Sequence, residues 1–134
     1  MNRIKGVIRD IESDDFLSII KVEAEIAPVY VLLLETPETA TYLKRGKEVN
    51  IIFKETEVEI VKDCSSEYNS FLNRFEGTVE SFEIGCVIAK IIFKVGDVKI
   101  FSIIPKKSFD SLKLEKGEKV SLIVRATEIS LEVL

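Results

Sequence analysis

Short stretches of alternating apolar and polar residues run through the whole chain. Between residues 20 and 26, apolar side chains at every second position alternate with Lys21, Glu23 and Glu25. This period is typical of a β-strand with one buried face. Similar stretches, separated by turn-forming residues, predict ten strands. They lie near residues 2–12, 20–26, 29–34, 49–53, 58–60, 75–83, 86–95, 98–104, 119–125 and 128–133.

Two short helices are predicted, one in each half of the chain. Thr36, Pro37 and Glu38 supply a hydroxyl cap, a proline at the first helical position and an acid in the first turn, and the segment ends at Gly46. The second helix is expected at about 108–113. Each helix falls between the third and fourth strands of its half.

Three landmarks recur with a constant displacement of 71 positions. The segment 2–6 (NRIKG) returns at 73–77, 46–49 (GKEV) at 117–120, and 53–60 at 124–131. A repeat of this kind indicates a duplicated structural unit. We therefore expect a first domain at 1–62, a linker at 63–72 and a second domain at 73–134. The element order predicts an all-β protein made of two tandem OB-like five-stranded Greek-key barrels, each with one short helix between strands three and four.

The charge and composition exclude several classes of function. The chain holds 19 basic and 23 acidic residues, which disfavours binding to nucleic acid. It has no histidine, no glycine-rich phosphate loop and no close-spaced pair among Cys64 and Cys86, so we expect neither an enzyme nor a metal site, with no catalytic residues and no cofactor. With no apolar run long enough to span a bilayer and no signal peptide, a cytoplasmic protein without membrane association is expected.

Two corners of the repeat could bind an anion. Lys54 and Thr56 form the first, and Arg125 and Thr127 the second. A cation and a hydroxyl two positions later, at the end of a strand, are groups that hold a tetrahedral oxyanion. The other interpretation is a turn in which the threonine caps backbone groups and the base is solvated. Residues 73–134 carry a net charge of +1 and residues 1–62 one of −3, which favours the second corner.

Taken together, these segments resemble the Mop family of molybdate-binding domains, in particular the tandem di-Mop form, and the related transport-associated OB domains. The opening motif of that family resembles residues 2–6 and, more loosely, 73–77. Its central motif resembles 85–91, and its closing motif resembles 124–129. The resemblance covers both halves apart from the linker.

The resemblance implies a cytoplasmic protein that binds molybdate or tungstate for storage or homeostasis, with anion sites between packed barrels. It implies a homotrimer, and it places ligand positions at the five residues Lys54, Thr56, Ser70, Arg125 and Thr127. Each unit of about 62 residues is close to the size at which a lone core is marginal, which agrees with association.

Some positions depart from the family pattern and leave alternatives open. Leu72 stands where the family has arginine, Ile88 replaces the central asparagine, and Glu55 replaces alanine. Two like charges ~4 Å apart repel by roughly 4 kcal/mol at an effective dielectric of 20, so Glu55 opposes an anion at the first corner. One alternative is a non-catalytic regulatory or protein-interaction module that kept the fold and lost the anion site. Another is an OB-type nucleic-acid binder.

Overall fold

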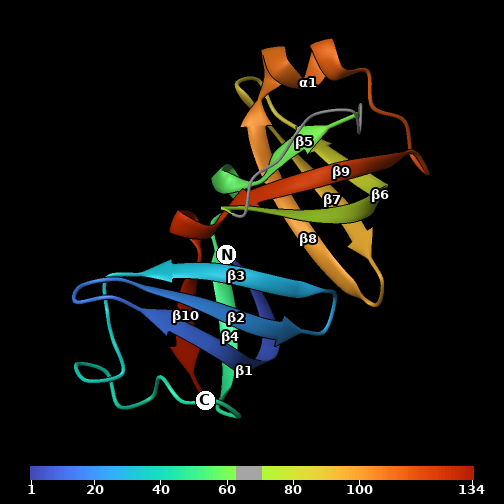
Figure 1. Ribbon diagram of the computed structural model, residues 1–134. Coiled ribbons are helices and arrows are strands. Elements are labelled where there is room, and N and C mark those ends of the chain that lie inside the picture. Colours follow the sequence, from blue (N-terminus) through green and yellow to red (C-terminus); the bar gives the residue numbers. More distant parts are fainter. Residues whose placement is uncertain (63–70) are drawn as a thin grey trace.

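The computed structural model describes residues 1–62 and 71–134. It contains two five-stranded antiparallel sheets, each curled into a barrel, which lie one above the other in Figure 1. The strands are β1 (Asn2–Ser13), β2 (Ser18–Ala24), β3 (Pro28–Leu33), β4 (Glu48–Phe53), β5 (Glu59–Val61), β6 (Leu72–Ile84), β7 (Ile88–Val95), β8 (Val98–Pro105), β9 (Lys119–Arg125) and β10 (Ser130–Val133). The predicted all-β fold of two OB-like barrels is confirmed.

The fifth strand of each copy pairs in the barrel of the other copy. The first barrel has the strand order β10-β4-β1-β2-β3, and the second has β5-β9-β6-β7-β8. Ile60 of β5 therefore lies opposite Leu122 of β9, and Leu131 of β10 lies opposite Ile51 of β4. The ranges 1–62 and 73–134 describe the repeat along the chain, whereas each barrel in space is built from both ranges.

Single-turn 3₁₀ helices carry the chain from one barrel to the other. η1 (Glu55–Glu57) joins β4 to β5, and η2 (Ala126–Glu128) joins β9 to β10. Both turns lie between the two barrels in Figure 1. The junction of the barrels is therefore formed by the same two segments that the sequence singles out as corners.

The helix predicted for the second copy is present, and the one predicted for the first copy is wrong. α1 spans Lys106–Leu112, while residues 37–39, 41–42 and 45–46 form turns. Thr39 Oγ1 accepts a hydrogen bond from the backbone N–H of Thr36 (2.9 Å) and donates one to the Thr36 carbonyl oxygen (3.2 Å). Local bonds of this kind compete with helix formation, and threonine is a poor helix former.

Alternating residues of the strands form the core. Ile20, Val22, Ile91 and Phe93 are fully buried, as the alternation in the sequence predicts. Residues from both barrels belong to a single cluster of buried apolar side chains, which includes Val58 beside the second barrel and Ile129 beside the first. The core thus continues through the junction. None of the helices in the described ranges is long and apolar enough to cross a membrane.

Buried asparagines join the two barrels at equivalent positions. The side chain of Asn2 donates to the carbonyl oxygen of Phe101 (2.9 Å) and accepts from its N–H (2.8 Å). Asn73 makes the same two bonds to Tyr30, both at 2.8 Å. The two pairs are related by the 71-residue displacement. Each side-chain amide bonds to both the N–H and the C=O of one residue, as a neighbouring strand would, along the outer edge of β3 or β8.

Candidate oxyanion site

The two corners have the same backbone geometry. Lys54 precedes η1 with φ −74° and ψ 149°, and Arg125 precedes η2 with φ −70° and ψ 141°. An extended strand therefore ends at the basic residue, one 3₁₀ turn follows, and the next strand enters the opposite barrel. The hydroxyl residue lies in the middle of each turn. The repeat seen in the sequence is thus a repeated local structure.

The structure groups the predicted ligand residues across the copies. Lys54 of the first corner and Thr127 of the second line one cavity of about 290 Å³ at the junction. Thr56 lies apart, in a groove of about 560 Å³ between β5, β8 and α1. Arg125 is exposed and lines neither of these two cavities. Ser70 lies outside the described residues.

The side chains of the corners are available to a ligand. Within residues 1–62 and 71–134, the side chains of Lys54, Thr56, Arg125 and Thr127 make no hydrogen bond or ion pair. In the alternative interpretation each threonine caps backbone groups. Among the described residues, neither Thr56 nor Thr127 makes such a bond. Among the described residues, a cation and a hydroxyl without a partner therefore remain at each corner, and each of these groups can bond to an oxyanion.

Glu55 does not line the junction cavity. Its Oε1 accepts a hydrogen bond from the Met1 amino group, 2.8 Å away. This bond lowers the pKa of the Glu55 carboxyl, with smaller contributions from its own backbone N–H and from the charge of Lys90. The carboxylate is therefore ionised, but it is paired. The repulsion that the sequence predicts at the first corner is offset by these two cations.

Glu57 and Glu128 are the acids that face the cavity. They are related by the 71-residue displacement and lie one on η1 and one on η2. Neither acid was expected at a site from the sequence, because a charged residue in a turn usually faces bulk solvent. The constant displacement was the available signal, because it marks Glu57 and Glu128 as equivalent residues of the two repeated turns.

Comparison with known proteins finds a domain family and a solved structure that are similar to this chain. The family model of the TOBE domain matches residues 69–131, which confirms the resemblance predicted from the sequence. A solved structure of the cytoplasmic molybdate-binding protein ModG, with molybdate bound, superposes with a TM-score of 0.89 at 24% identity. The match covers 99% of this chain and 96% of that one. A comparison with the curated proteins finds no match.

Proposed function

We propose that this protein binds a tetrahedral oxyanion of the molybdate or tungstate type and acts in its storage or homeostasis. The observation that carries the proposal is that no described residue pairs with the cation or the hydroxyl of either corner, in a fold shared with molybdate-bound ModG over almost the whole chain. The proposed ligand residues are Lys54, Thr56, Arg125 and Thr127, together with Ser70. The proposal describes a binding protein rather than an enzyme, working in the cytoplasm.

Arg125 is proposed to contribute most of the affinity. Its guanidinium is exposed, lacks a partner among the described residues and sits in the more basic copy. Arginine presents several donors in a rigid fork that suits an oxyanion. Ala126 stands beside it where the first copy has Glu55, so no acid adjoins the second corner on that side.

We further propose that three chains associate. Large apolar side chains are exposed at equivalent ends of the two barrels: Phe16 at 77%, and Val87 at 76% in the second copy. Leu34 is 85% exposed at the end of β3. Packing against other copies of the chain would cover these side chains and bring polar groups of a second chain to the exposed Arg125. Oxyanion sites would then lie between barrels of different chains.

Calorimetric titration with molybdate tests the proposal. We expect the intact protein to bind, and Arg125→Ala to weaken binding about tenfold or more, because hydrogen bonds to charged groups contribute about 1.5–3 kcal/mol. Arg9→Ala is the matched control, since Arg9 is also exposed and has no partner among the described residues. Native mass spectrometry of the same samples reports the number of chains and of bound anions.

Failure of the intact protein to bind either molybdate or tungstate would refute the proposal. The alternative of an interaction module that lost its anion site would then stand. This alternative is not favoured by the match to the ModG structure, or by the corner side chains, which have no partner among residues 1–62 and 71–134.

A further inference from the structure

The second barrel has a groove between its two outer strands and its helix. β5 and β8 lie at opposite ends of the strand order and do not pair with each other. A side-chain bond joins them where the Ser102 hydroxyl of β8 donates to the carbonyl oxygen of Val58, next to β5 (2.9 Å). The space between β5, β8 and α1 is a groove of about 560 Å³, which we call the edge groove. A volume of this size is ordinary for a binding site.

The edge groove is apolar apart from a few polar groups. Its apolar lining includes partly buried side chains from all three elements, namely Ile60 and Val61 of β5, Ile103 and Ile104 of β8, and Leu112 of α1. Among the described residues that line the groove, Glu59 has the one charged side chain. It is exposed and forms no ion pair within residues 1–62 and 71–134. A ligand that suits this groove therefore combines apolar groups with a positive charge.

The first barrel differs at the equivalent place. The turn segment that follows β3 buries Ala40, which is 6% exposed. Its equivalent on α1 is Ser111, which is exposed and lines the edge groove. The helix thus carries one wall of the groove, whereas the first copy forms turns there. The first barrel can therefore serve as an internal control for binding.

The backbone of β8 offers hydrogen bonds to the edge groove. The N–H and C=O of Phe101 point away from β7, since both bond to the side chain of Asn2, at 2.8 and 2.9 Å. Along an antiparallel strand these directions alternate from residue to residue. The N–H and C=O of Ile103 therefore also point outward, at a position that lines the groove, and no described residue forms a hydrogen bond with them. Asn2 shows that this edge accepts a strand-like partner, and Ile103 continues the edge beyond it.

We propose that the edge groove binds an extended segment of a partner protein, which adds a strand along the outer edge of β8. Main-chain bonds to Ile103 hold the segment, alternate apolar side chains contact the floor of the groove, and a lysine or arginine lies beside Glu59. Strand addition of this kind takes affinity from backbone bonds and specificity from alternate side chains. The groove is separate from the corner cations, because neither Lys54 nor Arg125 lines it.

A capped hexapeptide tests the proposal. The probe is acetyl-Thr-Val-Lys-Val-Thr-Val-amide, in which valines alternate with threonine and lysine. Nuclear magnetic resonance spectra of the full isotope-labelled chain should show shifts in the amides of β5, β8 and α1. At a free peptide concentration about ten times the dissociation constant, hydrogen exchange at the Ile103 amide should slow about tenfold. Absence of binding at millimolar peptide, or equal shifts along β3 of the first barrel, overturns the proposal.

Analogues of the peptide separate the two contributions. Two analogues carry a methyl group on every second backbone nitrogen, one in each register. At least one of them should bind about tenfold more weakly, because it lacks the donors that face β8. Exchange of the lysine for glutamate replaces attraction by Glu59 with repulsion and should lower the affinity by about threefold. In the Glu59→Lys variant the order of the lysine and glutamate peptides should reverse, and an unchanged order contradicts the proposal.

A substitution in β8 removes the donor from the protein itself. Proline is tolerated on an edge strand where the N–H faces outward, so Ile103→Pro should keep the ladder to β7. The peptide should then bind about tenfold more weakly. Leu32→Pro is the matched control, because Leu32 is the equivalent residue on the outer edge of β3, and this variant should keep its affinity for the peptide. Circular dichroism checks folding, and Glu59→Lys, at an exposed position, decides the question if Ile103→Pro does not fold.

The competing occupant of the edge groove is a second copy of this chain. In that case the Ile103 amide would already be protected from exchange in the free protein, and Ile103→Pro would reduce the number of associated chains in native mass spectrometry. Either result overturns the proposal of a partner segment. Peptide binding without molybdate binding, or the reverse, distinguishes this proposal from the proposed function.

Discussion

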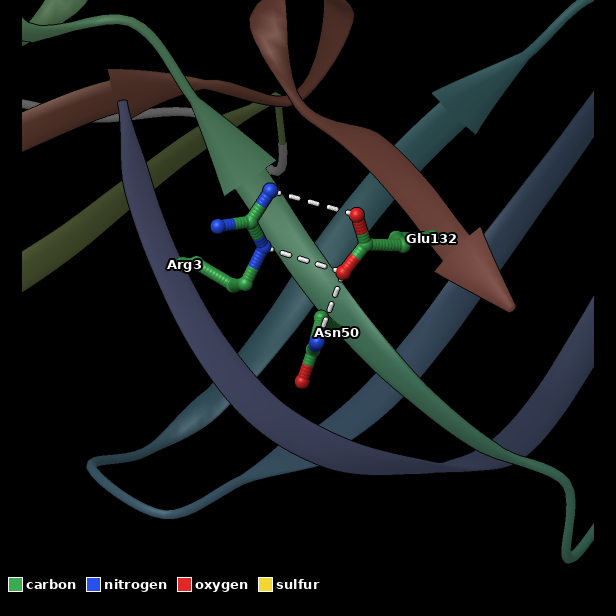
Figure 2. A network of polar contacts seen from close by, with 3 residues as sticks. All are labelled: Arg3, Asn50 and Glu132. Carbon is green, nitrogen blue, oxygen red and sulfur yellow. Dashed lines mark hydrogen bonds and ion pairs between the residues drawn. The ribbon is translucent and has the colours of Figure 1, made fainter. Parts of the chain in front are cut away.

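The two barrels are copies of one design, but their closing strands are held by different chemistry. In the first barrel, β10 brings Glu132 against Arg3 of β1 and Asn50 of β4 (Figure 2). Arg3 donates to both carboxylate oxygens, at 2.9 and 3.2 Å, and Asn50 donates to one of them at 2.8 Å. The closing strand of this barrel is thus held by a charged network in addition to its backbone bonds.

The second barrel has an apolar residue where the first has Glu132. The equivalent position on β5 is Val61, and the equivalent of Asn50 is Ser121. Arg74 donates to the Ser121 hydroxyl, at 3.0 and 3.2 Å, and its Nε lies 3.7 Å from Oε1 of Glu76 on the same strand. On this side Ser102 donates to the carbonyl oxygen of Val58 (2.9 Å). Duplication therefore preserved the exchange of strands, while the polar contacts that accompany it diverged.

The largest effect should come from the buried residue that precedes each closing strand. Ile129→Ala should destabilise the protein by about 3 kcal/mol and Val58→Ala by about 2 kcal/mol, because both side chains are almost fully buried. Since each barrel needs a strand from the other copy, we expect one urea transition for the wild type and for both variants. Separate transitions for the two barrels would show that the exchange does not couple them.

A smaller and equal effect is expected from the two asparagines. Asn73→Ala and Asn2→Ala each remove two hydrogen bonds and leave the backbone N–H and C=O of Tyr30 or Phe101 without that partner. Each variant should lose about 2 kcal/mol in the free energy of unfolding. Strongly unequal losses, measured by urea unfolding, would mean that the junction is less symmetric than the matching distances indicate.

The smallest effect concerns the response of the first barrel to acid. Hydrogen bonds from Asn50 and then from Arg3 lower the pKa of the Glu132 carboxyl below its ordinary value of 4.5. A carboxyl whose pKa is lower in the folded than in the unfolded state stabilises the protein at pH values above the unfolded-state pKa. This stabilisation is lost as the pH falls through the folded-state pKa. Glu132→Gln should therefore be less stable than wild type at pH 7, with the difference disappearing in acid.

Urea midpoints at pH 7 and at about pH 3 measure this difference. Glu59→Gln is the control, because Glu59 is an exposed acid on the closing strand of the second barrel with no ion pair among the described residues. A difference between Glu132→Gln and wild type that stays constant with pH would show that the network of Figure 2 does not act through the ionised carboxylate.

Residues near one another in the chain were predicted well. The alternation at residues 20–26 located β2, and the landmarks at 2–6 and 73–77 located β1 and β6. The helix at 36–46 was wrong because its start signals, Thr36 and Pro37, also suit a turn, and the later Thr39 bonds back to the backbone. The repeat in the sequence identified the basic and hydroxyl residues of the candidate site. It did not predict which of these residues line the same cavity.

The sequence by itself determined the strands, the duplication and the two corners, because alternation, repetition and local turn chemistry are carried by neighbouring residues. Only the tertiary structure decided that β5 and β10 exchange barrels. Alternation specifies which face of a strand is buried, but two related cores accept the same pattern, so it does not specify which barrel the strand joins. For the same reason the meeting of Lys54 with Thr127, and of Glu57 with Glu128, became visible only once the paths of the two copies through space were known.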